Sequence, residues 1–311
     1  TEVCTDESGD GKCDKCGRVQ NAISFAGANM TLGNELKMNF MIPKASYKEG
    51  MTAKVYHEIV GNADPANDRI VDEEVPFEKY NSSYYYVCLS VCAKEMNDVI
   101  TVTAFDASGK QVSEPYTRTI KDYAAGQLAN AKDDYTKIMI TDMLIYGAEA
   151  QKFFEYRTDA LATEGVDLAY ASSNGEYSDK NKVQPTQFAG CNLSLKDNIL
   201  FNVFVKNTTT NMRAVVTFTN HKGEDVNMEI PYSAFEAYSG ATKKLVIDKT
   251  VVADARQLIT VTVYKGDALY GTYVNSIEGY VAGQMAKAGS PELYPAIMRF
   301  ADSTYNYLHN R

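Results

Sequence analysis

The sequence predicts a mainly β fold with additional α-helices, arranged as two tandem β-sandwich (Ig-like) modules that are each followed by two helices. Three features predict it: segments in which apolar and polar residues alternate, turn signals between them, and an internal duplication. The 311 residues, 45% of them hydrophobic, suffice for two folded domains. We expect an arm or linker, a first module, a linker and a second, homologous module, at residues 1–20, 21–161, 162–186 and 187–311.

The duplication is visible in three short motifs that recur in the same order. Each motif is followed here by its second copy: FAGANMTL (25–32) by FAGCNLSL (188–195), VITVTAF (99–105) by LITVTVY (258–264), and IKDYAAGQLA (120–129) by IEGYVAGQMA (277–286). The offset between copies falls from 163 to 159 to 157 residues. The second copy is therefore slightly shorter, with deletions between elements, where loops tolerate them.

Each copy begins with segments that have the pattern of strands. Leu36, Met38 and Phe40 alternate with other residues, which is the period of two of half-buried strands. DASGKQ (106–111) and NHKGED (220–225) place Gly among polar residues, as hairpin turns do. Several short strands at this spacing predict a β-sandwich.

The period then changes to that of helices. Residues 119–131 are Ala-rich, and from residue 134 to 156 apolar residues recur at steps of four and three, namely Met139, Met143, Tyr146, Ala150 and Phe153. In the second copy, Ser290 can cap a helix that has Pro291 at its first position. Its apolar stripe is predicted to continue through Ile297, Ala301, Tyr305 and Leu308.

The composition excludes several classes of protein. The net charge of -9 is spread along the chain, so we expect no nucleic-acid binding, because phosphate recognition needs a basic surface. No apolar run reaches the roughly 18 to 20 residues of a membrane-spanning helix, so we expect no such segment and no signal peptide. The 22 Tyr and the absence of Trp are typical of a β-rich extracellular protein.

Catalytic motifs are missing from the sequence, which has no HExxH, GxSxG, Walker loop or strand-linked GxGxxG. His57 and His221 occupy different places in the two copies, so neither belongs to a site that the duplication repeated. We therefore expect the protein not to be an enzyme.

The motif FAGANMTL, followed by a long helix and YGAEAQKFFEY (146–156), resembles modules in large surface proteins of gut and rumen Clostridia, which are Firmicutes. Those proteins often carry a segment similar to residues 9–17 between modules. The resemblance implies export to the cell surface and a non-catalytic structural or adhesive role. Self-assembly into a filament, stalk or surface layer would make other copies, or other cell-surface proteins, its partners.

The N-terminal loop CTDESGDGKCDKCG (4–17) supports three hypotheses. The first is a Ca²⁺ site, since the loop resembles dockerin and thrombospondin type-3 calcium loops in its spacing of Asp6, Ser8, Asp10, Lys12 and Asp14. Gly17 stands where such a loop brings a bidentate Glu. The second hypothesis is a Zn²⁺ site that uses the CDKCG knuckle, and the third is a disulfide of Cys4 with Cys13 or Cys16.

The segment YNSSYYYV (80–87) suggests carbohydrate binding as an alternative function, by a pair of modules that attaches bacteria or enzymes to polysaccharide. Strand geometry places Tyr84 and Tyr86 on one face and Tyr85 on the other, and an exposed Tyr can stack on a pyranose ring. The competing interpretation is a strand with one core face and one ordinary surface. Cys88 and Cys92 are expected to be small buried residues.

Overall fold

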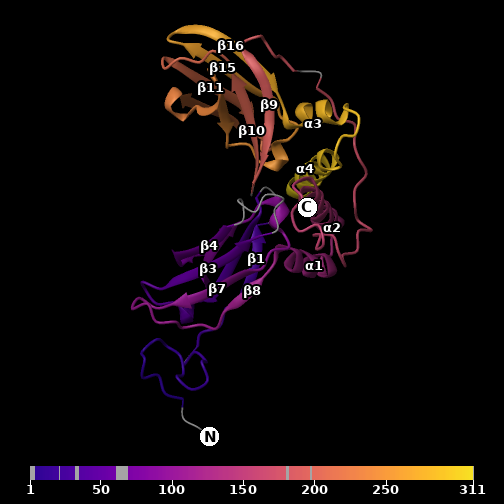
Figure 1. Cartoon of the computed structure of the whole chain (residues 1–311). Coiled ribbons are helices and arrows are strands. Elements are labelled where there is room, and N and C mark those ends of the chain that lie inside the picture. Colours follow the sequence, from indigo (N-terminus) through magenta and orange to yellow (C-terminus); the bar gives the residue numbers. More distant parts are fainter. Residues whose placement is uncertain are drawn as a thin grey trace. The chain divides into compact units, whose positions relative to one another are not determined.

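The computed structural model describes residues 4–20, 22–31, 35–60, 69–179, 182–196 and 198–310. Within these residues the chain is mostly β, with four antiparallel sheets and four α-helices (Figure 1). The prediction of a mainly β fold with helices is confirmed. Leu32, the last residue of the first repeated motif, lies outside the described residues.

The first half of the chain forms sheets with the strand orders β1-β2-β6-β5 and β4-β3-β7-β8. Its strands are β1 (Gly27–Thr31), β2 (Lys37–Pro43), β3 (Thr52–Ile59), β4 (Arg69–Pro76), β5 (Glu78–Lys79), β6 (Tyr84–Ser90), β7 (Ile100–Phe105) and β8 (Tyr116–Arg118). Helices α1 (Ile120–Asn130) and α2 (Asp134–Phe153) follow the strands.

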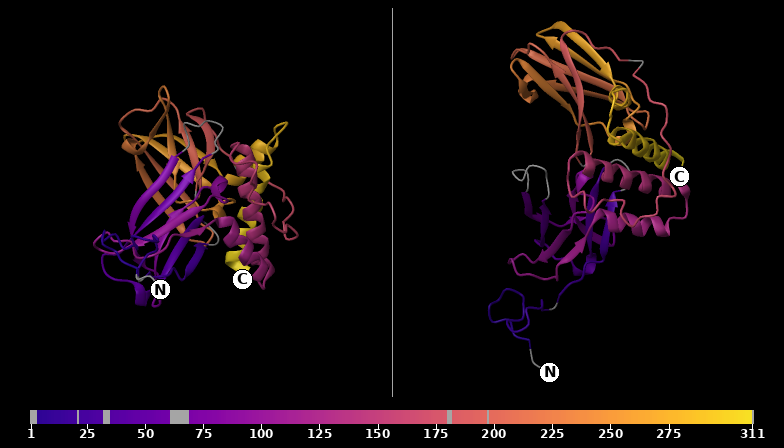
Figure 2. Two further views of the ribbon diagram at one scale, coloured as in Figure 1. Left: turned by 60° about the horizontal axis from the view of Figure 1, so that its bottom comes forward. Right: turned by 45° about the vertical axis from the view of Figure 1, so that its right-hand side comes forward.

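The second half forms sheets with the orders β13-β14-β10-β9 and β12-β11-β15-β16. Its strands are β9 (Phe188–Leu195), β10 (Ile199–Val205), β11 (Met212–Thr219), β12 (Asp225–Pro231), β13 (Glu236–Ser239), β14 (Thr242–Ile247), β15 (Ile259–Lys265) and β16 (Ala268–Asn275). Helices α3 (Ile277–Met285) and α4 (Leu293–Asn310) come last. Adding eight to each strand number of the first half reproduces these orders, so the duplication extends to strand pairing. Figure 2 shows the strands and helices of each half in two further views.

The predicted alternation is the pattern by which the strands bury side chains. Met38, Phe40 and Ile42 on β2 are fully buried, as are Phe201 and Val203 at the matching positions of β10. Burying a side chain of this size contributes roughly 1.5–3 kcal/mol, so each such face stabilises its own half.

One hydrogen bond between a backbone N–H and a side-chain carboxylate recurs in both halves, at the short 3-10 turns η3 (Ala93–Glu95) and η5 (Val252–Asp254). The Glu95 carboxylate accepts a hydrogen bond from the Cys92 N–H, and the Asp254 carboxylate accepts one from the Val251 N–H, both at 3.0 Å. Each acid satisfies a donor at the start of its turn. The duplication has therefore kept these turns, as well as the strands.

The helices begin and end close to the predicted positions, with three differences in burial. Along α2, the residues Met139, Met143, Tyr146 and Ala150 are buried as expected, whereas Phe153 in the last turn is 44% exposed. The predicted stripe of α4 is wrong at Tyr305 and Leu308, which are each 40% exposed. Helix α4 also begins at Leu293 rather than at Pro291, because helix ends depend on local hydrogen bonds that a periodic pattern does not specify.

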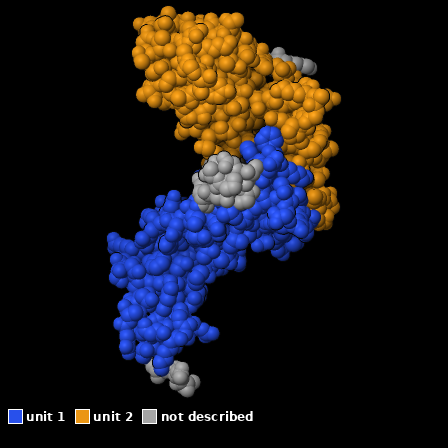
Figure 3. Space-filling view, viewed as in Figure 1, with its two compact units in different colours: residues 1–32, 36–130, 150–166 blue, residues 33–35, 131–149, 167–311 orange. Residues whose placement is uncertain are grey.

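The described chain divides into two compact units, coloured separately in Figure 3. Unit 1 comprises residues 1–32, 36–130 and 150–166, and unit 2 comprises residues 33–35, 131–149 and 167–311. Most of α2 is thus grouped with the second half, whereas the predicted domain boundaries follow the duplication and stay predictions. Among the helices that the structure describes, none is both long and apolar enough to cross a membrane.

Candidate functional sites

The N-terminal loop folds as a small hairpin that holds two of its cysteines. Lys12 bridges Val19, and the Cys13 N–H donates to the Arg18 carbonyl at 2.8 Å. Gly17, whose φ is +70°, closes the turn by donating its N–H to the Cys13 carbonyl at 2.8 Å. A left-handed φ of this kind favours glycine, which explains the residue type at this position.

The third cysteine is brought to the hairpin by a backbone contact. The Asp14 N–H donates to the Thr5 carbonyl at 2.9 Å, which places Cys4 beside the turn. The sulfur atoms of Cys4 and Cys16 lie 3.9 Å apart, and those of Cys4, Cys13 and Cys16 all lie within 4.8 Å of one another. We call these three residues the thiol cluster. Among the residues that the structure describes, no other group of three His, Cys, Asp or Glu side chains is placed closely enough to hold a metal ion.

The three thiols differ in their electrostatic surroundings. Hydrogen bonds from the backbone N–H groups of Cys16 and Lys15 lower the pKa of the Cys13 thiol to about 7. Hydrogen bonds to Cys13 and Cys16 raise the pKa of the Cys4 thiol to about 11. Cys13 is 2% exposed, whereas Cys4 and Cys16 are exposed. Cys13 is therefore the member of the cluster best prepared to act as a thiolate.

The first residues of the predicted calcium loop are engaged within the protein. The Asp6 carboxylate accepts hydrogen bonds from the Lys110 ammonium and from the Gly11 N–H, and the Lys110 contact lowers its pKa. The Ser8 hydroxyl donates to the same carboxylate at 3.4 Å. The ammonium of Lys110 thus places a positive charge next to Asp6, at the position that the Ca²⁺ hypothesis assigns to the metal ion.

The later carboxylates of the loop accept hydrogen bonds from backbone N–H groups. Asp10 accepts from the Lys12 N–H at 2.8 Å, and Asp14 accepts from the Glu7 N–H at 2.6 Å. The Glu7 contact, followed by that with Ser8, lowers the pKa of Asp14. Both acids have a role in holding the loop, and the Ca²⁺ site stays a prediction.

The loop is attached to the connection between β7 and β8 of its own half. The Gln111 N–H donates to the Asp10 carbonyl at 3.3 Å, and the Val19 N–H donates to the Glu114 carboxylate at 3.0 Å. Gly11 lies so close to Gln111 that a Cβ atom there would stand 2.3 Å from the Gln111 carbonyl oxygen. These contacts attach the arm to unit 1 through backbone groups and side chains together.

The predicted stacking residues Tyr84, Tyr85 and Tyr86 on β6 are each partly exposed and have different neighbours. Tyr85 stacks on Tyr47, with ring centroids 3.7 Å apart and planes 9° from parallel. Tyr86 packs edge-on against Tyr80 at 5.3 Å. The pairing register of β2 with β6 places Tyr84 and Tyr86 on one face and Tyr85 on the other, as strand geometry predicts.

A polar and aromatic surface surrounds Tyr86, and sequence reasoning missed most of it. The Asn29 amide donates to the Tyr80 hydroxyl at 3.2 Å, and the Asn39 amide donates to Asn29 at 2.9 Å. The Tyr86 hydroxyl donates to Glu78 at 3.5 Å. We call this surface the tyrosine face of the first half, made of Asn29, Asn39, Met41, Glu78, Tyr80 and Tyr86.

Strand pairing places a similar surface on the second half. Glu236 pairs with Lys244 as Glu78 pairs with Tyr86, so Lys244 stands where the first half has Tyr86. Tyr238, which corresponds to Tyr80, packs on Phe204 at 4.3 Å. The tyrosine face of the second half is made of Asn192, Asn202, Phe204, Glu236, Tyr238 and Lys244. The shared signal was available in the sequence, in the Asn of the repeated FAG motif.

Two buried acids make networks that no motif indicated. Asp98 contacts His57 at 3.1 Å and Arg157 at 3.2 Å, and it accepts a hydrogen bond from the Tyr156 hydroxyl. Burial, followed by the contact with Asp98, raises the pKa of Tyr156. In the second half, Asp254 contacts the His221 ring at 2.9 Å. The histidines lie at different positions of the two halves, as the sequence predicts.

The cysteines outside the loop differ from the prediction that they are small buried residues. Cys88 on β6 is exposed, and Cys92 is half-buried. Cys88 pairs with Asn39 in the register of β2 with β6, and so lies on the outer side of its sheet, with Tyr86. The apolar appearance of the segment VCLSVC did not specify which strand face each cysteine occupies.

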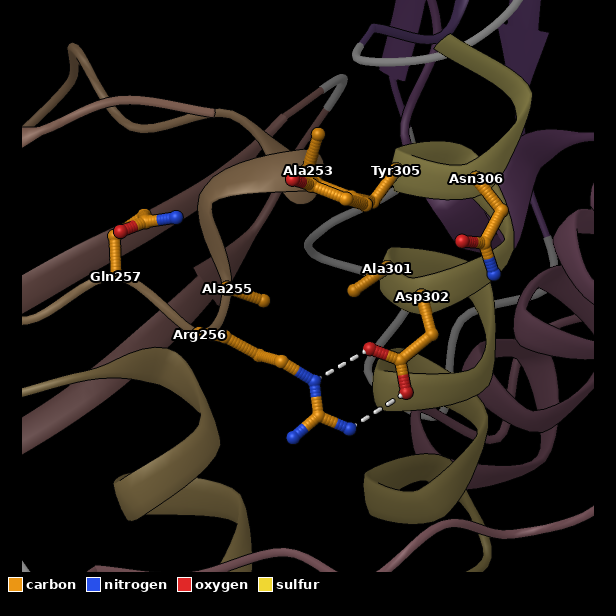
Figure 4. A pocket seen from close by; sticks show the side chains of 8 residues that line it. All are labelled: Ala253, Ala255, Arg256, Gln257, Ala301, Asp302, Tyr305 and Asn306. Atoms are coloured by element: carbon orange, nitrogen blue, oxygen red, sulfur yellow. Dashed lines mark hydrogen bonds and ion pairs between the residues drawn. The ribbon is translucent and has the colours of Figure 1, made fainter. Parts of the chain in front are cut away.

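A surface pocket of about 490 Å³ lies in unit 2 between the η5 turn and α4 (Figure 4). Its charged groups are Arg256 and Asp302, which form a bidentate ion pair at 2.7 and 2.9 Å. Arg256 also donates to Glu278 at 2.8 Å, and its guanidinium lies 5.5 Å from the Tyr177 ring centroid. With two carboxylates already bound, the guanidinium is not available to an anionic ligand.

Comparisons with known proteins do not assign a family. No protein-family model matches the chain, and no curated protein matches it. Among solved structures, it is similar to the crystal structure of the selenomethionine-substituted chicken interferon gamma receptor alpha chain. The identity is 8% and the TM-score is 0.20, over 81% of this chain and 95% of that chain. A likeness at this score carries no argument about fold or function.

Proposed function

We propose that this chain is a non-catalytic structural or adhesive protein of the cell exterior, built from two tandem Ig-like β-sandwich modules that are each followed by two helices. The main supporting observation is that equivalent contacts between strands recur in both halves. The Asn29–Asn39 and Asn192–Asn202 hydrogen bonds, each at 2.9 Å, are one such pair. Two equivalent surfaces on one chain raise avidity without any new contact. The resemblance to surface-protein modules of Clostridia agrees with the proposal.

The ionisable networks support a non-catalytic role. His57 and Asp98 are each 1% exposed, and the side chains of His221 and Asp254 are 6% and 1% exposed. A catalytic acid or base must come within hydrogen-bond distance of its substrate, directly or through one water molecule. In these buried pairs each side chain instead satisfies the hydrogen-bonding groups of its partner, which buried polar groups require.

A second candidate function, binding of polysaccharide, is favoured by the tyrosine faces. Tyr80 and Tyr238 occupy equivalent positions and are 44% and 61% exposed. Each lies on a surface that also carries a glutamate, Glu78 in the first half and Glu236 in the second. An exposed ring can stack on a sugar ring while neighbouring polar groups bind its hydroxyls.

The structural or adhesive role is tested by the assembly state and surface binding of the full chain. We expect its mass by size-exclusion chromatography with light scattering to rise with concentration, or the chain to co-sediment with bacterial cell-wall fragments. A chain that stays monomeric and leaves the fragments unbound would contradict the proposal.

The polysaccharide hypothesis is tested by affinity electrophoresis in gels that contain soluble plant or bacterial polysaccharides. The double variant Tyr80→Ala/Tyr238→Ala should lose the retardation shown by the unmodified chain. Tyr135→Ala on α2 is the matched control, since Tyr135 is 41% exposed and lies outside the tyrosine faces. Equal migration of the double variant, the control and the unmodified chain would exclude a role of these faces.

A further inference from the structure

We propose that Cys4, Cys13 and Cys16 together bind one Zn²⁺ ion, with the fourth coordination position taken by water. The inference concerns the thiol cluster alone and does not depend on the proposed function. It selects one of the hypotheses that the sequence leaves open for the loop.

The spacing of the sulfur atoms fits zinc better than a disulfide. A Zn–S distance of about 2.3 Å in a tetrahedron puts neighbouring sulfurs about 3.8 Å apart. Cys4 Sγ and Cys16 Sγ lie 3.9 Å apart, and Cys13 Sγ lies within 4.8 Å of both. A disulfide needs about 2.05 Å, so two sulfurs would have to approach by nearly half their present separation. Three converging sulfurs are also one more than a disulfide uses.

The backbone around the cluster supports bound thiolates. The N–H groups of Lys15 and Cys16 hydrogen-bond to the Cys13 sulfur. Such outer contacts orient a ligand and offset its negative charge when it holds a metal. Gly17, with φ +70°, allows the tight turn that brings Cys13 and Cys16 to one side of the hairpin. The local fold therefore prepares two ligands, and the Asp14–Thr5 contact adds the third.

The chemistry of the donors favours zinc over calcium. Thiolates are soft ligands that suit zinc, whereas calcium takes oxygen ligands. Cys4 and Cys16 are exposed, so water can reach the bound ion. Each thiol that binds releases its proton to solvent.

Bound zinc would hold the arm in its observed shape. It would join the segment at Cys4 to the hairpin at Cys13 and Cys16, which is itself attached to the connection between β7 and β8. Constraining a loop in this way stabilises it by lowering the entropy of its open state. Removal of zinc should therefore increase hydrogen exchange in residues 4–19 and leave the sheets protected.

The experiment uses the full chain, purified under reducing conditions, equilibrated with zinc and freed of excess metal. Elemental analysis should find about one zinc per chain, and cobalt(II) substitution should give the visible bands of tetrahedral thiolate coordination. Cys4→Ser, Cys13→Ser and Cys16→Ser should each lose stoichiometric zinc. Cys88→Ser, on β6 outside the cluster, should keep it. Far-UV circular dichroism checks that every variant has folded.

Three results would overturn the proposal. They are zinc uptake that survives in Cys13→Ser, no uptake by the reduced chain, and uptake of calcium alone. If the chain is instead purified without reductant, so that dissolved oxygen can act as the oxidant, a mass lower by two hydrogens together with no zinc uptake would show that a disulfide forms instead. Stoichiometric zinc in a chain that neither assembles nor binds cell walls would support the site while contradicting the proposed function.

Discussion

Replacing Tyr156 by Phe should destabilise unit 1 by removing one hydroxyl from the buried Asp98 network. Tyr156 is 0% exposed and Asp98 is 1% exposed, so water cannot replace the lost hydrogen bond. A hydrogen bond to a charged group contributes about 1.5–3 kcal/mol. Asp98 keeps His57 and Arg157 as partners, so we expect the lower end of this range. Phe keeps the ring that packs at this site, including its contact with Lys94 at 4.6 Å.

Equilibrium unfolding in urea measures this effect. A loss of about 1.5–2 kcal/mol weakens the folding equilibrium roughly 10- to 30-fold and lowers the urea midpoint by roughly 1 M. Tyr56→Phe is the matched control in the same unit, because the Tyr56 hydroxyl also meets a carboxylate, that of Glu58, but at an exposed position and 3.4 Å. We expect the control to change stability by less than about 0.5 kcal/mol. Equal midpoints for the two variants would refute the reasoning.

Three further predictions concern Asp142, Gly11 and Asp6. Burial raises the pKa of Asp142, so the contribution of this carboxyl group to stability falls as pH rises above 3.8. The variant Asp142→Asn can keep both contacts with Ser172, and we expect its melting temperature to depend less on pH than that of the unmodified chain. Gly11→Ala, at φ +90° and against a backbone carbonyl, should cost about 1–3 kcal/mol in loop attachment, seen as faster hydrogen exchange of residues 10–20 with an unchanged melting temperature. Lys110 lowers the pKa of Asp6, so their ion pair stabilises the loop above pH 3.8, and this stabilisation is lost as pH falls through the lowered pKa. In Lys110→Gln, the hydrogen-exchange rates of residues 10–20 should no longer rise at that pH. If the pH dependence of melting in Asp142→Asn equals that of the unmodified chain, the first prediction is wrong. Exchange rates equal to those of the unmodified chain in Gly11→Ala or in Lys110→Gln would contradict the other two.

Much of the fold could be predicted because each strand or helix has a periodic pattern of apolar residues that are close together in the sequence. Met38 and Phe40 alternate on a strand and are both buried, and Met139 and Met143 share the buried face of α2. These patterns depend on the period of one element, which a short segment contains completely. Near the end of a helix the periodic pattern no longer indicates which side chains are buried, and both Phe153 and Leu308 are exposed.

A site could be predicted from the sequence when its residues lie close together along the chain. Cys4, Cys13 and Cys16 lie within one short loop, and the structure brings their sulfurs within 4.8 Å of one another. Of the tyrosine face of the first half, sequence reasoning found only Tyr86, because Tyr80 and Asn29 join that face through the folding of separate segments. The Asp98 network was missed because His57 and Tyr156 lie 41 and 58 residues away from Asp98 in the sequence.

The sequence by itself determined that this chain is a duplicated, mainly β protein with helices after each set of strands, and that its N-terminal loop concentrates metal-binding residue types. Only the tertiary structure decided which of those residues meet. It placed three sulfurs together, engaged Asp6 with Lys110 and buried Asp98 among partners. The physical reason is that periodicity is a property of adjacent residues, whereas contacts between distant polar groups depend on how separately formed elements pack.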